Sequence, residues 1–137
     1  MGLYLCVFRG DEEIDGVEVG SYDDFGFFRD AVRDHLEAGQ TGTLFPVLML
    51  HSDCDGSWSP HQAKQLVGEL RTISESFSTI EPVDFNSDWQ RDVAKLVGLR
   101  PRSLKDCFID VDGEPLIERI IELCETAIHE GLPILFQ

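Results

Sequence analysis

Apolar and polar positions follow two different periods along this chain. Five short segments are either continuously apolar or alternate with a period of two, as buried and half-buried strands do. These predicted strands are Leu3–Phe8, Val17–Val19, Phe45–Leu50, Cys107–Ile109 and Pro133–Phe136. The most hydrophobic of them, Phe45–Leu50, predicts a central strand.

Four other segments repeat their apolar residues at helical spacing, and each begins with a recognisable helix start. These starts are Ser21, Ser59 with Pro60 and Gln62, Ser87 with Gln90, and Pro115. In the third helix we expect Trp89, Val93 and Leu96 to face inward. The order β-β-α-β-α-α-β-α-β predicts a single α+β domain over residues 1–137, with a mixed sheet of about five strands and about four helices.

The net charge of −15 narrows the classes of partner. Such a field repels nucleic acid and anionic membranes and attracts basic proteins and cations. The alternative is that the acidity only maintains solubility. The N-terminus lacks a signal-peptide pattern, and the four cysteines show no CxxC spacing, which predicts a cytoplasmic protein with free thiols. Residues 91–105 differ from the rest, because they carry five basic side chains and one acidic one.

Two acidic turns share the pattern Asp-x-Asp-Gly. Asp53 and Asp55 lie in one turn, and Asp110 and Asp112 lie in the other. If the preceding strands were parallel, both turns would open at one edge of the sheet, where four carboxylates and His51 could hold a divalent cation. The EF-hand pattern is not met, however, and the alternative is that these residues simply build turns and helix entries.

Two further features are candidates for binding a partner. Trp58 lies in a polar, acidic loop, so it is either a binding anchor or a staple on the helix that begins at Pro60. Glu118, Glu122 and Glu125 share one face of the last helix, which is either a contact surface or an ordinary solvated face. The chain has no GxSxG nucleophile motif and no glycine-rich phosphate loop, so we expect no catalytic residue and no cofactor.

The segments HSDCDGSWSP, GLYLCVF, VEVGSYDDF, CFIDVDGEPL and GLPILF, taken together and in this order, resemble the immunity protein 70 family of bacterial polymorphic toxin systems. The resemblance runs from Gly2 to Phe136. It implies an α+β protein of the cytoplasm that binds and neutralises a cognate toxin by occlusion, without catalytic residues of its own.

An acidic inhibitor suits a basic toxin such as a nuclease, because opposite charges steer association. The residues that we expect to contact the toxin are Asp53, Asp55, Trp58, Asp110, Asp112, Glu118, Glu122 and Glu125. Two alternatives remain open at this point: a metal-dependent hydrolase built on the two acidic turns, and a scaffold or regulatory subunit. The sequence leaves the oligomeric state open.

Overall fold

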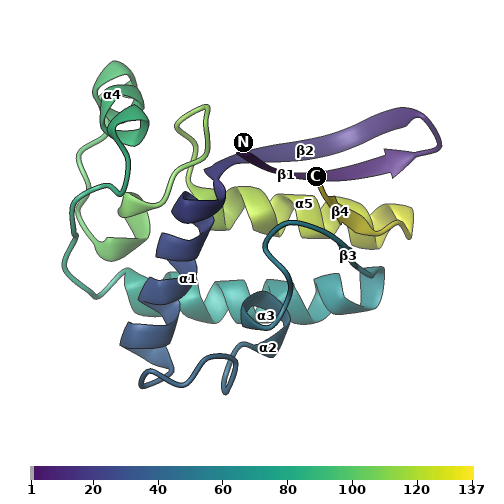
Figure 1. Ribbon diagram of the computed structural model, residues 1–137, viewed down its shortest axis with the longest axis horizontal. Helices are drawn as coiled ribbons and strands as arrows, with labels where there is room; N and C mark the ends of the chain where they lie inside the picture. The colour runs from purple at the N-terminus through teal and green to yellow at the C-terminus, as the bar shows by residue number, and fades with distance from the viewer. Residues whose placement is uncertain (1) are drawn as a thin grey trace.

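The computed structural model describes residues 2–137 and confirms the predicted α+β class. Four strands and five α-helices make up this part of the chain, together with one 3-10 turn (Figure 1). The strands are β1 (Gly2–Arg9), β2 (Glu12–Ser21), β3 (Ser57–Trp58) and β4 (Ile134–Phe136). The helices are α1 (Tyr22–Leu36), α2 (Pro46–Met49), α3 (Pro60–Phe77), α4 (Asp88–Val97) and α5 (Leu116–Glu130), and the 3-10 turn η1 is Leu104–Cys107.

The sheet has the order β2-β1-β4-β3, and all of its pairings are antiparallel. β1 and β2 form an antiparallel hairpin, and β2 is longer than the strand predicted at residues 17–19. The C-terminal strand lies inside the sheet, with Phe136 opposite Leu5 in β1. The sheet is therefore antiparallel rather than mixed, and it has four strands where about five were predicted.

The segment Phe45–Leu50 is not a strand, because charged side chains hold it as the short helix α2: Glu37 accepts from the amide of Phe45, and Glu69 and Arg29 bind the helix itself. The carboxylate of Glu69 accepts hydrogen bonds from the first free amides of α2, at 3.1 Å from Val47 N and 2.9 Å from Leu48 N. At the other end, the guanidinium of Arg29 donates to the carbonyls of Leu48 and His51. Arg29 belongs to α1 and Glu69 to α3. The apolar pattern of residues 45–50 alone therefore cannot predict that these side chains stabilise a helix there.

The segment Cys107–Ile109 is likewise not a regular strand. Cys107 ends η1, and Ile109 forms a single isolated bridge with Pro115. The backbone amide of Leu104, at the start of η1, donates to the carbonyl of Ile80 after α3. This contact fixes the segment as a link between α3 and α5.

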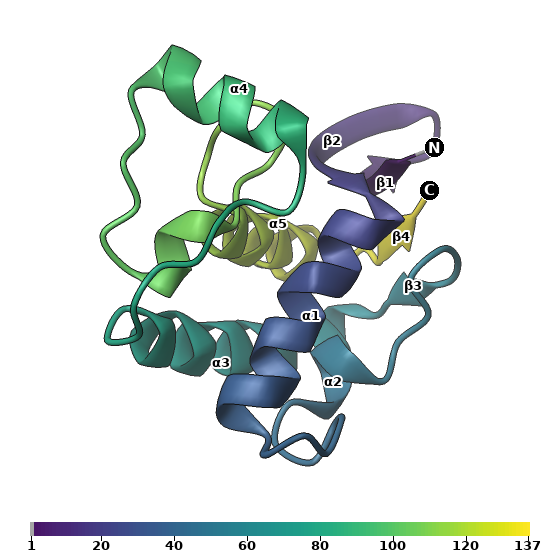
Figure 2. The same ribbon diagram turned by 60° about the vertical axis from the view of Figure 1, so that its left-hand side comes forward.

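Helix α5 lies between the sheet and α3, and α1 crosses α3 on one side (Figures 1 and 2). The first, second and last of the predicted helices correspond to α1, α3 and α5. Their apolar faces all pack into one hydrophobic core. Phe28 of α1 and Phe77 of α3 both contact Phe108, with ring centroids 5.1 and 5.8 Å away. None of the helices among residues 2–137 is long and apolar enough to cross a membrane.

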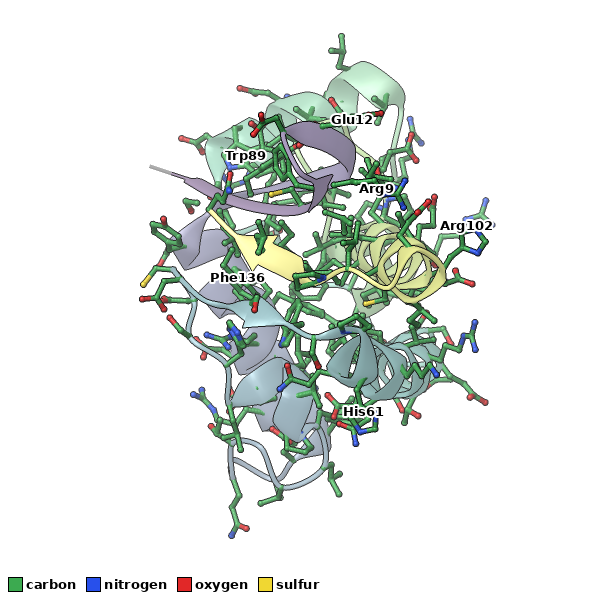
Figure 3. The ribbon with its side chains drawn as sticks, turned by 90° about the vertical axis from the view of Figure 1, so that its right-hand side faces the viewer. Arg9, Glu12, His61, Trp89, Arg102 and Phe136 are labelled. Carbon is green, nitrogen blue, oxygen red and sulfur yellow. The ribbon has the colours of Figure 1, made fainter. Side chains whose placement is uncertain are left out.

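Helix α4 stands at one end of the molecule, away from α3 and α5 (Figures 1 and 2). Its N-terminal end is fastened by Trp89, which lies between α4 and the hairpin (Figure 3). Gly20, at φ +117°, allows this approach, because an added Cβ would come within 2.6 Å of the indole of Trp89. The expectation that Leu96 faces inward is wrong: its side chain is 86% exposed.

Candidate interaction surface

The residues proposed from the sequence lie in three separate places. The first is the loop between α2 and β3, where Asp53 and Asp55 are both exposed. His51 lies at the base of this loop and stacks on Phe136, with ring centroids 4.1 Å apart. Its two ring nitrogens lie 2.8 Å from the carbonyl oxygen of Ser52 and 3.0 Å from that of Ser57. His51 therefore ties the loop to its own backbone.

Trp58 is part of the hydrophobic core. Its side chain has no exposed area, its ring meets Phe136 edge to face, and its Nε1 donates to the carbonyl of Val47 at 3.1 Å. This favours the packing interpretation over the binding anchor, because a partner cannot reach the indole in this conformation. An alanine at position 58 therefore affects stability first.

The turn Asp110–Gly113 is closed by its own first residue. Oδ1 of Asp110 accepts hydrogen bonds from the amides of Asp112 and Glu114, at 2.9 and 3.0 Å. Asp110 is buried, and this burial raises the pKa of its carboxyl above the ordinary value. The carboxylate of Asp112 faces solvent instead. Only Asp112 of this pair is thus available to a partner.

The three glutamates on α5 do not form a uniform acidic face. Glu118 lies 3.4 Å from Nζ of Lys105, and Glu122 lies 3.3 Å from the guanidinium of Arg119. Glu125 is exposed and borders a shallow hollow between α5 and α3 that also contains Lys64 and His129. Basic side chains therefore offset much of the charge of this stripe.

The two acidic turns do not meet at a common sheet edge. Asp53 follows helix α2, and Asp110 follows an isolated bridge, so neither comes directly after a strand of a parallel pair. Within residues 2–137, no group of three or more His, Cys, Asp or Glu side chains is placed to hold a metal ion. All four cysteines are free thiols, with Cys54 exposed and the other three buried.

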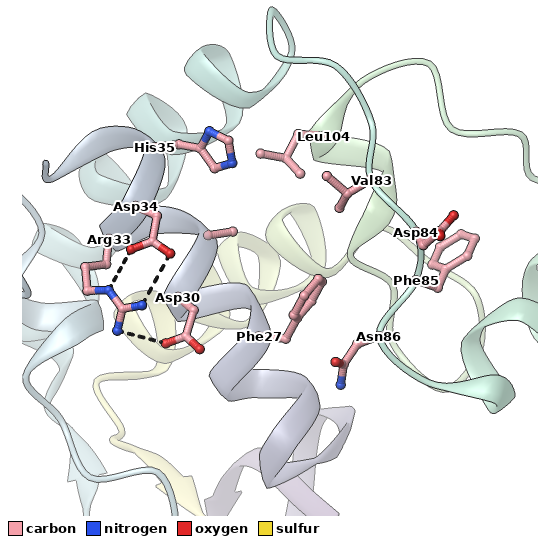
Figure 4. Close-up of a pocket in the computed structure, with 11 residues that line it drawn as sticks. Phe27, Asp30, Arg33, Asp34, His35, Val83, Asp84, Phe85, Asn86 and Leu104 are labelled. Carbon is pink, nitrogen blue, oxygen red and sulfur yellow. Dashed lines mark hydrogen bonds and ion pairs between the residues drawn. The ribbon is translucent and has the colours of Figure 1, made fainter. Parts of the chain in front are cut away.

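A groove between α1 and the extended segment 83–86 is a candidate site that sequence patterns did not indicate (Figure 4). Its volume is about 570 Å³. Its apolar lining comes from Phe27, Ala31, Val83 and Leu104. Phe27 and Ala31 follow the helical period of α1, but the other two residues come from segments without a repeating pattern. The groove thus depends on tertiary packing that no local signal reveals.

The border of this groove is acidic. Asp30 and Asp34 project from α1, and Asp84 from the opposite segment (Figure 4). Arg33 is the neighbouring base, at 3.2 Å from Oδ1 of Asp30 and 2.8 Å from Oδ1 of Asp34. Three carboxylates and one guanidinium therefore border the groove, and the guanidinium pairs with the two carboxylates on α1. An apolar lining with an acidic border suits a long basic side chain, whose methylenes pack inside while its cation meets the carboxylates.

A single carboxylate holds one wall of the groove in place. Asp24, at the start of α1, accepts hydrogen bonds from the side chains of Asn86, Ser87 and Trp89. Burial acts to raise the pKa of Asp24, but its hydrogen bonds, the strongest from Ser87, outweigh this effect and lower the pKa to about 2. Asp24 is therefore ionised near neutral pH and joins the segment that ends in Asn86 to α1.

Comparison with known proteins gives one match. The family model described as Immunity protein 70 matches residues 3–136, nearly the whole chain. No curated protein and no solved structure matches the chain at a significant level.

Proposed function

The chain belongs to the immunity protein 70 family, and from this membership we propose that it binds a cognate protein toxin and neutralises it. The family match over residues 3–136 is the single observation that carries the proposal. The described residues contain neither a metal-binding cluster nor a nucleophile motif that would favour a hydrolase instead.

The negative net charge of the chain favours a basic toxin as its partner. Nucleases are one class of toxin with a basic surface. A net charge of −15 attracts a basic protein over a range of about 10 Å at moderate salt, and so raises the rate of association. An acidic surface also resembles a nucleic-acid substrate in the sign of its charge. We therefore propose that neutralisation occurs by occlusion of the toxin's active site.

We propose the groove between α1 and segment 83–86 as the surface that receives the toxin. Its apolar lining excludes water from part of the contact, and contacts of that kind carry most of the binding energy in protein interfaces. Asp30, Asp34 and Asp84 then provide the complementary charge at its border. The second proposal is the loop with Asp53 and Asp55, which is exposed and acidic but has no hollow of its own among the described pockets.

Affinity capture tests the proposal directly. The purified chain is immobilised and exposed to a lysate of its native organism in which expression of the toxin has been confirmed, and bound proteins are identified by mass spectrometry. Recovery of one toxin domain in stoichiometric amount supports the proposed function. Recovery of a protein unrelated to toxicity would instead favour a scaffold or regulatory subunit.

A further inference from the structure

The C-terminal end of α4 presents an apolar surface on the outside of the molecule. Leu96 is 86% exposed and the adjacent Val97 is 52% exposed. Single exposed apolar side chains are ordinary, but contiguous ones beside a hollow mark interaction sites. Val97 lines a hollow of about 340 Å³.

Two segments form the walls of this hollow. One wall consists of Val97, Gly98 and Leu99 at the end of α4, and the other of Gly113 and Pro115 before α5; Asp106 and Ile109 complete the lining. The two walls are in contact, because a Cβ on Gly113 would come within 3.0 Å of Val93 in α4. Gly113 also has φ +82°, a backbone conformation that disfavours any side chain. Both this conformation and the contact with Val93 therefore favour glycine at this position. Gly113 thus allows the two walls to approach each other closely.

The two walls are bordered by opposite charges. Lys95 and Arg100 flank the α4 wall, in the segment with five basic residues and one acidic residue. Asp112 and Glu114 flank the other wall, and all four of these side chains are exposed. A uniformly basic toxin does not match such a surface. A second copy of the chain does, because rotation by a two-fold axis places each basic border opposite an acidic one.

We propose that two copies of the chain associate through this surface, the α4 patch, which we define as Leu96, Val97, Leu99 and Pro115. In the proposed dimer, Leu96 of each copy enters the hollow of the other. The apolar side chains of both copies are then buried from water in the same interface. The charged borders fix the relative orientation of the two copies. The groove proposed for the toxin shares no lining residue with this hollow, so the dimer leaves the toxin-binding surface free.

The size of the patch predicts a dimer that depends on concentration. Stable interfaces usually bury about 800 Å² on each partner. The patch has only a few exposed apolar side chains, so we expect a weaker association than an interface of that size gives. The proposal is therefore tested over a wide range of concentration rather than at a single one.

Sedimentation velocity of the purified chain, between about 1 μM and about 1 mM, measures the association. We expect a monomer at the low end and a dimer at the high end. Leu96→Glu should remain monomeric throughout, because it places a carboxylate in the hollow. Leu50→Glu is the matched control, since Leu50 is 66% exposed but lies outside the patch, and it should sediment like the unaltered chain. Far-UV circular dichroism verifies that both variants are folded.

Exchanging charges tests the two-fold arrangement separately. Arg100→Glu and Glu114→Arg should each weaken the dimer by about tenfold, and the double variant should recover it. The proposal is overturned by a monomer at every concentration, by a dimer that persists in Leu96→Glu, or by a double variant no better than the single ones. It is also overturned if Leu96→Glu leaves sedimentation unchanged and weakens toxin binding instead, which would assign the patch to the toxin. Failure of toxin binding alone leaves the dimer proposal standing.

Discussion

The indole Nε1 of Trp89 donates a hydrogen bond of 2.9 Å to Oδ2 of Asp24, and this bond joins α4 to the first turn of α1. The same carboxylate accepts from Asn86 and from Ser87, so it holds the whole segment between the groove and α4. Asp24 also completes the N-terminal cap of α1, because its carboxylate accepts from the amide of Ser21 at 2.9 Å. One buried acid thus serves both the helix start and the attachment of the outlying helix.

The stability of the fold should depend on the ionisation of Asp24. Its pKa is about 2 in the folded chain, against an ordinary value of 3.8 that we take for the unfolded chain. A lowered pKa stabilises the folded state above pH 4, and this contribution is lost as the pH falls from about 4 to about 2. We expect Asp24→Asn to lose about 2 kcal/mol at neutral pH and to lack this part of the acid dependence.

Urea unfolding of both proteins at several values of pH between 7 and 2 measures the difference. Asp23→Asn is the control, since Asp23 is adjacent, exposed and accepts one hydrogen bond, from Asn86. Equal acid dependence of Asp24→Asn and the unaltered chain would show that Asp24 has no such role.

Trp58 should be required for stability. Trp58→Ala should reduce the free energy of unfolding by about 3–5 kcal/mol, because it leaves a cavity beneath Phe136 and removes the hydrogen bond to Val47. Trp58→Phe retains most of the apolar volume and should lose less. Thermal unfolding ranks the two variants against Ser57→Ala, a change at an exposed neighbour. A Trp58→Ala protein as stable as Ser57→Ala would contradict the buried position of the indole.

Glu69 should hold α2 in its helical form. Glu69→Ala removes the acceptor of two α2 amides and should cost about 1–3 kcal/mol. Hydrogen exchange should accelerate at Val47 and Leu48 and remain unchanged across the β1–β2 hairpin. Glu75→Ala on the same helix is the control, because Glu75 is exposed. Unaltered exchange at the two amides would mean that α2 is held by other contacts.

The parts of the fold that could be predicted from sequence are those with local signals. The caps at Ser21 and Ser59 give the starts of α1 and α3 correctly, because the atoms that form each cap lie within four residues. The short helix α2 could not be predicted in this way, since its two capping side chains are 19 to 22 residues away in the chain. Leu96 fits the apolar period of α4, but periodicity cannot tell which helix has little to pack against.

The candidate site was less predictable than the fold. Trp58 stands out in the sequence because its neighbours are polar. In the structure it is a core residue that contacts Val47 of α2 and Phe136 of β4, and neither partner is close to it in the chain. The groove combines α1 with residues 83–86 and with Leu104, which are distant from α1 in the chain. Asp34 and Asp84 border the groove from opposite sides, but no sequence motif contains both residues.

Charge reversal should locate the toxin-binding surface. Three pairs of substitutions are compared: Asp34→Lys with Asp84→Lys, Asp53→Lys with Asp55→Lys, and Glu122→Lys with Glu125→Lys. Each pair changes the net charge equally, so the long-range attraction is reduced to the same extent in all three. We expect the groove pair to weaken toxin binding by at least about 2 kcal/mol, roughly thirtyfold, and the other pairs by much less.

Isothermal titration with the captured toxin domain measures these affinities at two salt concentrations. A loss confined to the pair at positions 53 and 55 would move the contact to that loop. Equal small losses in all three pairs would mean that charge acts only at long range.

The central claim is that the chain neutralises a toxin by binding it. The most direct measurement is the activity of the captured toxin domain, titrated with the purified chain. We predict that activity falls linearly and reaches zero at one chain per toxin domain. Full toxin activity in the presence of excess folded chain would contradict the account.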